Sequence, residues 1–224
     1  MSIFFNKLNY DDFAKTFSKS RNNLKWQEIN YFLQNYSSNI NNKRILDIWC
    51  WNARLLEHFY QNDIKNFDYL WLDSSKEMIW EAKTKFRENN FLVCDMLELS
   101  KIKQKDFESI FFIASFHHLN TFNQRKEVLL QLKNIIKPWS YIFMTNWDLN
   151  SELNLKKYNK SIIKNSQNEF WSLDFNIKIW EFNRFYHSFC LKELEFLFKS
   201  TWYEIIENRL FENKKNIISI IKTL

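Results

Sequence analysis

The sequence contains no glycine. At the usual frequency of about 7%, a chain of this length would have roughly 16 glycines, yet its 224 residues include none. They include ten tryptophans, which is many for so rare a residue. Glycine is the default residue where a backbone turns left-handed or must come close to a ligand. Ordinary glycine turns are therefore excluded, unless some of the tryptophan letters stand for glycine.

Several tryptophans stand where the local pattern calls for glycine: Trp49, Trp51, Trp71, Trp139 and Trp202. Pro138 precedes Trp139, and Pro-Gly is a common turn signal whereas Pro-Trp is not. Trp202 ends the helical segment 191–200, where a left-handed cap favours glycine. Some bacteria read the codon UGA as glycine, while other code tables read it as tryptophan. We interpret most of these tryptophans as glycines; the alternative is a genuinely tryptophan-rich protein.

Not every tryptophan fits this interpretation. Trp26 lies in a helical pattern where nothing calls for glycine, so we interpret it as tryptophan. Lys, Asn, Ile and Phe are abundant, which is typical of proteins from AT-rich genomes and suits a lineage with a reassigned UGA codon. The codons of the gene would decide between the two interpretations.

Cysteine is scarce as well. Cys50, Cys94 and Cys190 are odd in number, far apart and without a C-x-x-C spacing. This pattern favours reduced thiols in a cytoplasmic protein and argues against a zinc site. The first residues lack the apolar core of a signal peptide, and the longest apolar run, near 110–116, is too short to cross a membrane. We expect neither a membrane anchor nor a bound metal.

The length and net charge of the chain restrict its possible fold and partners only weakly. The length fits a single domain, 1–224, with a sizeable core. With 32 basic and 26 acidic residues the formal net charge is +6. A positive balance permits an anionic partner such as RNA, but a lysine-rich surface without such a partner gives the same balance.

Strand-like and helix-like segments alternate from residue 44 onward. Strands are predicted at 44–49, 68–73, 90–95, 107–114 and 140–146. Helices are predicted between them at 52–61, 76–87 and 123–136. Such alternation predicts an α/β fold with a parallel sheet and helices on both faces. Two later strand-like runs, 203–211 and 215–223, predict an antiparallel C-terminal hairpin at the sheet edge, which makes seven strands.

Acidic residues stand at the ends of three successive strands: Asp47, Asp73 and Asp95. Ligands of parallel α/β sheets bind at the carboxyl ends of the strands. Asp73 could accept both hydroxyls of a ribose, and Asp95 could accept from an adenine amino group with Met96 against the ring. Each alone is equally a common helix cap or turn residue. Three in succession indicate a nucleotide-cofactor site.

A histidine pair follows the fourth strand. His117 and His118 lie in a strand-to-helix loop, where they could bind a metal, act as a base or orient a substrate. Further metal ligands at suitable spacing are not evident. We favour substrate orientation over an ordinary loop role.

Two segments flank the alternating region. Residues 9–35 have aromatic residues at helical spacing, which predicts that residues 1–40, including Arg21, form an N-terminal helical lid; a helix packed on the sheet edge is the alternative. Residues 148–189 are predicted to be a substrate-side insertion, ending in a segment that contains Arg184 and His187. Arginine, histidine and aromatic residues together can stack on a base and hold a phosphate; a packed loop is the alternative.

Several of these segments resemble class I S-adenosylmethionine-dependent methyltransferases over roughly residues 40–224. I-L-D-I-W-C-W-N resembles their first motif, with tryptophan at two glycine positions. Y-L-W-L-D-S-S resembles their second-strand motif, V-C-D-M the third, and I-I-K-P-W-S-Y-I-F-M the segment before the fifth strand. The resemblance implies a Rossmann-like fold, with a seven-stranded, mainly parallel sheet and an antiparallel C-terminal hairpin, and S-adenosyl-L-methionine as cofactor.

A closer resemblance is to methyltransferases that esterify carboxymethyluridine at the tRNA wobble position, including the domain fused to AlkB-like dioxygenases. It rests on F-H-H-L, on N-R-F-Y-H-S-F, and on Y-D-D-F-A-K-T-F-S-K-S-R-N-N-L-K-W near the start. It implies cofactor contacts at Asp47, Trp49, Trp51, Asp73 and Asp95. It implies catalytic or substrate-side roles for Arg21, His117, His118, Arg184 and His187. For some relatives a small activating protein partner is also implied.

Three functions follow as alternatives. The first is a methyltransferase acting on a tRNA wobble uridine, where a carboxylate acceptor is ionised at neutral pH and needs no base. The second is a small-molecule methyltransferase of the same fold; an amine or hydroxyl acceptor would make His117 or His118 the candidate base. The third is a non-catalytic RNA- or partner-binding module, which genuine tryptophans at 49 and 51 would favour, because two indole rings would fill the cofactor pocket.

Overall fold

The computed structural model describes residues 26–87, 90–212 and 214–224. Arg21 and most of the expected N-terminal lid lie outside these ranges. The described end of that segment forms α2 (Gln27–Asn35), whose apolar residues Ile29, Phe32 and Leu33 are buried. The segment therefore ends in a helix, as its spacing predicts.

Seven strands form one mixed sheet in the order β3-β2-β1-β4-β5-β9-β8. They are β1 (Arg44–Ile48), β2 (Asp68–Asp73), β3 (Asn90–Val93), β4 (Phe107–Ile113), β5 (Ile136–Trp147), β8 (Tyr203–Leu210) and β9 (Asn216–Thr223). The first five are parallel, whereas β9 is antiparallel to both of its neighbours. The predicted fold class is confirmed, and the strand order reverses between β1 and β4, where such sheets bind ligands.

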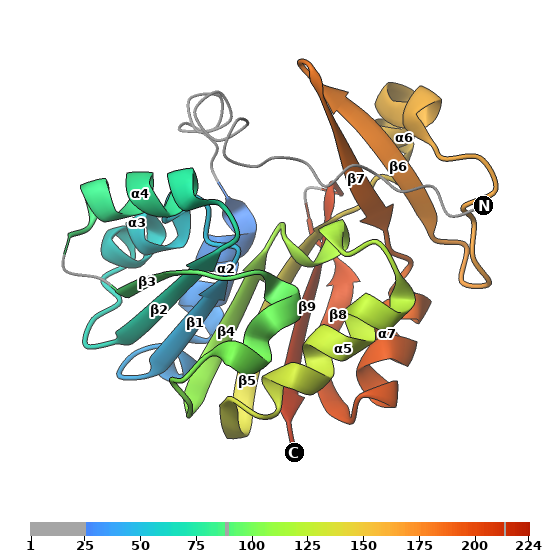
Figure 1. The fold of residues 1–224 in the computed structure, drawn as a ribbon. Coiled ribbons are helices and arrows are strands. Elements are labelled where there is room, and N and C mark those ends of the chain that lie inside the picture. The colour runs from blue at the N-terminus through green and yellow to red at the C-terminus, as the bar shows by residue number, and fades with distance from the viewer. Residues whose placement is uncertain (1–25, 88–89, 213) are drawn as a thin grey trace.

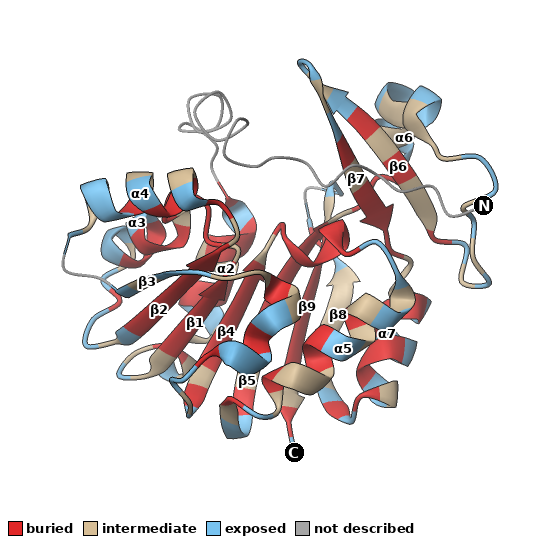
Figure 2. Cartoon of the chain, viewed as in Figure 1, coloured by how far each residue is buried: buried red, intermediate tan, exposed pale blue. Residues whose placement is uncertain are grey.

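Helices cover both faces of the sheet, and the core lies in two layers between them and the strands (Figure 1). On one face lie α2, α3 (Arg54–Gln61) and α4 (Lys76–Lys85); on the other lie α5 (Phe122–Leu132) and α7 (Leu191–Ser200). Leu55, Leu56 and Phe59 of α3 recur at helical spacing and are buried. Figure 2 shows the strands of the main sheet largely in the colour of buried residues, whereas the helices are partly buried and partly exposed.

A second, two-stranded sheet stands beside the carboxyl ends of the main strands (Figure 1). It is the hairpin of β6 (Leu173–Ile179) and β7 (Phe182–Ser188), and α6 (Glu152–Tyr158) precedes it. The sequence indicated only an insertion in this region, so the hairpin was missed. Its two-residue turn is hidden in the sequence because Trp180, at the first turn position, is not a turn residue.

The connection into β5 differs from the sequence-based expectation. Helix α5 ends at Leu132, four residues before the predicted end, and β5 begins at Ile136 rather than 140. Ile136 pairs with Phe107, but the next pair is Tyr141 with Ser109, so the residues between them bulge out of the ladder. The expected turn after Pro138 is therefore present, as a bulge inside a longer strand.

Tryptophans occupy many of the left-handed backbone positions. Fourteen described residues have positive φ, and six of these are Trp49, Trp51, Trp139, Trp171, Trp180 and Trp202, with φ between 53° and 69°. A non-glycine residue in this conformation costs roughly 1–2 kcal/mol. Six together cost roughly 6–12 kcal/mol, which is comparable to the whole stability of a typical domain, about 5–15 kcal/mol.

Trp71 differs from these six, although the sequence suggests glycine there too. It lies inside β2 and is fully buried. Its ring packs 4.7 Å from that of Phe91 and 4.4 Å from that of Tyr69. The backbone therefore makes no demand for glycine at this position.

Candidate active site

A compact loop connects β1 to α3 at the switch point of the sheet. Trp49, Trp51 and Ala53 all have left-handed backbone, with φ of 69°, 57° and 68°. The Cys50 N–H donates to the carbonyl of Leu72 at 2.8 Å, and the Ala53 N–H donates to the carbonyl of Cys50 at 3.0 Å. The loop is thereby tied to the end of β2, as a cradle at the carboxyl edge requires.

Asp73 lies beside this loop at the end of β2. Its Oδ2 accepts from the Trp51 N–H at 2.9 Å, and its Oδ1 accepts from the Ser75 N–H at 2.9 Å. The Ser75 hydroxyl in turn caps α4 by accepting from the Met78 N–H. The structure thus brings two of the predicted cofactor positions, 51 and 73, into direct contact.

Asp47 lies one residue inside β1 and is almost fully buried. Tyr69 donates its hydroxyl proton to Asp47 Oδ2 at 3.1 Å. Burial raises the pKa of Asp47 to about 7; the Tyr69 hydrogen bond opposes this rise, and the nearby charge of Asp73 adds to it. Asp47 therefore lies inside β1, next to the cradle, and its carboxyl group gains or loses a proton near neutral pH.

Asp95 and Met96 lie beyond the short strand β3. Asp95 Oδ1 accepts from the Leu97 N–H at 3.1 Å and caps the short 3-10 helix that begins at Met96. This is the helix-cap role that the sequence left open as an alternative. The Met96 side chain is buried in the main core. A contact of either residue with a cofactor stays a prediction.

The histidine pair lies on a 3-10 turn after β4, formed by Phe116–His118. His117 Nδ1 accepts from the Trp147 N–H at 3.2 Å, so its ring proton is on Nε2. His118 Nδ1 lies 2.8 Å from the carbonyl oxygen of Phe185, so it carries the proton. In their neutral forms the two rings therefore have opposite tautomers, one with a donor and one with an acceptor at Nε2.

Aromatic rings join the histidines to the hairpin and to the cradle. Tyr186 of β7 stacks on Trp147 at 5.2 Å and 14°, and on His117 at 5.4 Å and 29°. On the other side, Trp49 packs edge-to-face against His118 with centroids 5.0 Å apart. The histidines therefore lie between the cradle and the hairpin.

Arg184 extends from β7 to the same place. Its Cζ lies 5.6 Å from the Trp49 ring centroid, 5.1 Å from that of Trp51 and 5.5 Å from that of Tyr186. Only 3% of its surface is exposed. A buried guanidinium surrounded by aromatic faces is held in place, so the structure brings Arg184 together with positions 49 and 51.

His187 lies at the base of the hairpin instead. Its Nδ1 is 2.6 Å from Asp174 Oδ1 and its Nε2 is 2.8 Å from Glu193 Oε2, so both ring nitrogens contact carboxylates. Arg125 lies 3.5 Å from the same glutamate. Burial would raise the pKa of Glu193, but the hydrogen bond and charge of His187, together with Arg125, lower it to about 2. The predicted substrate contact is not part of this geometry.

The residues as written do not fit a nucleotide cofactor. Such a cradle needs positions without side chains, so that the backbone can approach the ligand. At both positions an indole lies between the loop and Arg184. We derive no chemical step from a cofactor bound in this arrangement.

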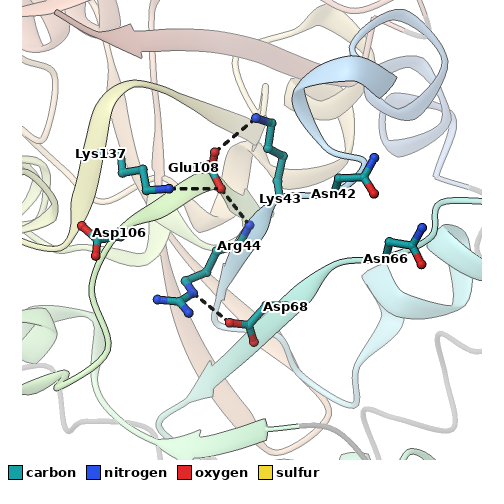
Figure 3. A pocket seen from close by; sticks show the side chains of 8 residues that line it. All are labelled: Asn42, Lys43, Arg44, Asn66, Asp68, Asp106, Glu108 and Lys137. Atoms are coloured by element: carbon teal, nitrogen blue, oxygen red, sulfur yellow. Dashed lines mark hydrogen bonds and ion pairs between the residues drawn. The ribbon is translucent and has the colours of Figure 1, made fainter.

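A polar pocket of about 320 Å³ lies at the opposite, amino edge of the sheet (Figure 3). Glu108 is at its centre, with Lys43 at 3.1 Å and Lys137 at 3.7 Å from its carboxylate oxygens. Burial would raise the pKa of Glu108, but these lysines lower it. Arg44 pairs with Asp68 at 2.8 Å. The charges are matched within the pocket, and it lies away from the predicted site residues.

The described residues contain no group of three or more His, Cys, Asp or Glu side chains arranged to hold a metal ion. No helix among them is long and apolar enough to cross a membrane.

Comparisons with known proteins agree on one family. A family model described as a methyltransferase domain matches residues 40–209. The tRNA (carboxymethyluridine(34)-5-O)-methyltransferase of Arabidopsis thaliana is 29% identical over 143 residues, 64% of this chain and 32% of the relative. The chain therefore spans about a third of the length of that relative.

Solved structures agree on the fold. An S-adenosylmethionine-dependent methyltransferase from Methanosarcina mazei has a TM-score of 0.65 at 20% identity, covering 89% of this chain and 98% of that one. A 1,6-didemethyltoxoflavin-N1-methyltransferase from Burkholderia thailandensis, with bound S-adenosylhomocysteine, has a TM-score of 0.65 at 11% identity, covering 95% and 85%.

Proposed function

We propose a tRNA wobble uridine as the methyl acceptor of this chain, which belongs to the methyltransferase-domain family and is an S-adenosylmethionine-dependent methyltransferase. The acceptor atom in this proposal is a carboxylate oxygen of a carboxymethyl group, and the product is its methyl ester. The Arabidopsis relative, whose name gives this reaction, supports the proposal over the part of its length that matches.

The position of Arg184 is the observation that carries the proposal. Strand β7 places its guanidinium beside the loop between β1 and α3, 5.1–5.6 Å from the rings written at 49 and 51. A guanidinium can bind a carboxylate with two parallel hydrogen bonds, which both neutralise and orient it. A protonated amine would be repelled by the same group.

The histidines fit an orienting role. Each has its Nδ1 bonded to a backbone group, which fixes the position of the ring. A carboxylate acceptor is already ionised and needs no proton removed. His117 and His118 then hold the acceptor side in place, by packing on Tyr186 and by hydrogen bonding, rather than acting as bases.

The test is transfer of a radioactive methyl group to tRNA. We would incubate the protein with methyl-labelled S-adenosylmethionine and tRNA that carries wobble carboxymethyluridine. A methyl ester is cleaved by mild alkali and releases volatile methanol, whereas methyl groups on ring nitrogen, ring carbon or ribose are stable. We expect alkali-labile label in the tRNA, located at position 34 by nucleoside analysis.

Two results would overturn the proposal. Alkali-stable label in tRNA would place the methyl group on another atom, and label only in small metabolites of an added extract would favour a small-molecule acceptor. A matched tRNA without the carboxymethyl group is the control and should remain unlabelled. An activating protein partner and a cytoplasmic location belong to the same proposal; addition of host extract to the assay tests the partner.

A further inference from the structure

We propose that this protein is built with glycine, not tryptophan, at six positions: 49, 51, 139, 171, 180 and 202. The inference starts from the mismatch between the written residues and the cradle, and it does not depend on which acceptor the enzyme uses. Its chemical consequence is a cofactor cradle whose loop has no side chains at the two positions that face the ligand.

The backbone conformation separates these six tryptophans from every other described large apolar residue. Of the fourteen described residues with positive φ, the eight that are not tryptophan are five Asn or Asp, two Ala and one Lys. Asn and Asp tolerate the left-handed region because their short polar side chains bond locally. No described Phe, Tyr, Leu, Ile or Val has positive φ. A preference of large aromatic residues for this conformation would have included Phe or Tyr.

Two of the positions are turn sites that require glycine geometry. At the bulge in β5, Pro138 precedes Trp139, whose φ is 67°, and proline followed by a left-handed residue is the order found in type II turns. Trp180 is the first residue of the two-residue turn between β6 and β7, with φ of 53°. The hairpin turn with one positive φ at this place takes glycine.

The other two loop positions follow the same rule. Trp202 comes directly after the C-cap residue Thr201 of α7, and its N–H donates to the carbonyl of Lys199 at 3.1 Å. This is the position at which helices end in left-handed glycine. The Trp171 N–H closes a turn on the carbonyl of Asn168 at 3.0 Å, and its φ is 68°. Glycine is favoured at the last position of such turns.

Exposure gives a second, independent observation. Trp139, Trp171 and Trp202 are 63%, 73% and 65% exposed, and Trp180 is about half exposed. Large aromatic side chains contribute to stability by burial, so these four gain little from their size while occupying an unfavourable backbone conformation. Trp26 is buried and Trp147 stacks on Tyr186, and neither has positive φ.

At 49 and 51, removal of the indoles changes the site itself. Without them the loop backbone between β1 and α3 faces Arg184 and Asp73 directly. In the chain as written, Asp73 Oδ2 already accepts from the N–H of residue 51. This contact lies next to the place that a ribose would occupy. With glycine at 49 and 51, the residues of the site fit a nucleotide cofactor. The loop has no side chains at these two positions, Asp73 lies at the end of β2, and the β6–β7 hairpin closes the acceptor side.

The cause that we infer is a codon assignment. A UGA codon at these six positions, decoded as glycine by the host but translated as tryptophan with another code table, accounts for the six misplaced tryptophans. The absence of written glycine follows if the gene also contains no GGN codon. The codon assignment also predicts UGG, the ordinary tryptophan codon, at 26 and 147.

The deciding experiment is mass spectrometry of tryptic peptides from the protein purified from its own host. The peptide of residues 45–54 includes positions 49 and 51. The peptide of residues 134–156 includes both 139, expected to be glycine, and 147, expected to be tryptophan. Because one peptide includes both, its fragment ions test the rule with an internal control. Peptides 165–178, 179–184 and 200–209 read the other three positions, and 26–43 reads Trp26.

The expected result is glycine at all six positions and tryptophan at 26 and 147. Tryptophan at 49 and 51 would overturn the proposal, and so would glycine at 147. The masses are read without any activity measurement. If the six positions are glycine and tRNA stays unlabelled, the acceptor proposal fails while this one stands.

Recombinant protein provides the functional measurement. We would compare the chain as written with the variant Trp49→Gly/Trp51→Gly by calorimetric titration with S-adenosylhomocysteine. Binding is expected for the glycine variant, and at least tenfold weaker binding for the chain as written. Equal affinities would show that the indoles leave room for the cofactor, and would overturn this part of the proposal.

Discussion

The guanidinium carbon of Arg184 lies 5.1 Å from the ring centroid of Trp51. This contact joins the β6–β7 hairpin to the loop between β1 and α3, two segments that are far apart in the sequence. The hairpin therefore contributes to the site, because it places the guanidinium of Arg184 at the carboxyl edge of the sheet. The acceptor side of the site depends on how firmly the hairpin is held.

The substitution Arg184→Lys should reduce methyl transfer while leaving cofactor binding intact. Lysine keeps the charge but loses the planar, two-pronged geometry. Loss of one charge-assisted hydrogen bond, about 1.5–3 kcal/mol, corresponds to a decrease of roughly 10- to 100-fold in kcat/KM. Kinetics with the chain that has glycine at 49 and 51 would measure it. Lys178→Ala, an exposed change on the same hairpin, is the control; equal losses in both variants would contradict the assigned role.

The substitution Glu193→Gln should destabilise the protein strongly. It leaves Arg125 and His187 buried without their carboxylate, and removing one partner of a buried ion pair costs about 3–5 kcal/mol. Urea denaturation would measure the change. Glu195→Gln on the same helix is the matched control, because Glu195 is exposed and its ion pair among the described residues is with Lys199; we expect little change in stability. A similar small effect in both variants would contradict the structural role of this network.

The lowered pKa of Glu193 also determines the pH below which its contacts with His187 and Arg125 stop stabilising the protein. Its folded value of about 2 lies below the ordinary 4.5, so its contribution to stability is present above pH 4.5 and is lost as the pH falls toward 2. Glu193→Gln should therefore show less acid destabilisation over this range than the parent protein, relative to each protein's own stability at neutral pH.

Much of the fold could be predicted from the sequence. The parallel strands and the antiparallel C-terminal pair lie where the apolar runs predict them, because burial in a sheet covered on both faces requires continuous apolar segments. Leu55, Leu56 and Phe59 face the core as their spacing predicts. The approach of Asp73 to position 51 follows from two neighbouring strands ending at one edge.

Other features depend on contacts between distant segments, which a single sequence does not contain. His187 looked like a substrate contact, but Asp174 and Glu193 bind both of its nitrogens. The β6–β7 hairpin was missed because its turn residue is written as Trp180, which gives no turn signal. The cap that Asp95 forms was only one of two alternatives, since an acid after a strand has the same pattern in either role.

Asp47 should make the protein less stable as the pH rises. The folded state retains a proton on this carboxyl up to a pKa of about 7, whereas the ordinary value is 3.8. Its contribution is therefore complete below pH 3.8 and is lost as the pH rises through about 7, by roughly 4 kcal/mol.

The measurement is the free energy of unfolding against pH for Asp47→Asn. The amide can still accept from Tyr69 but does not titrate, so the slope between about pH 4 and 7 should become less negative than in the parent protein. Asp63→Asn is the control, since its side chain is 80% exposed and asparagine tolerates its left-handed backbone. An unchanged slope in Asp47→Asn would contradict the raised pKa.

Replacing one exposed tryptophan by glycine should raise or lower the stability of the protein, according to the backbone conformation at that position. Trp202 and Trp80 are 65% and 64% exposed, but Trp202 has a φ of 56° whereas Trp80 lies inside helix α4. In the recombinant chain as written, Trp202→Gly relieves a left-handed side chain and should stabilise the protein by roughly 1 kcal/mol. Trp80→Gly adds backbone freedom to a helix interior and should destabilise it by up to about 1 kcal/mol. Thermal or urea unfolding measures both, and a loss of stability in Trp202→Gly would contradict the assignment of glycine at that position.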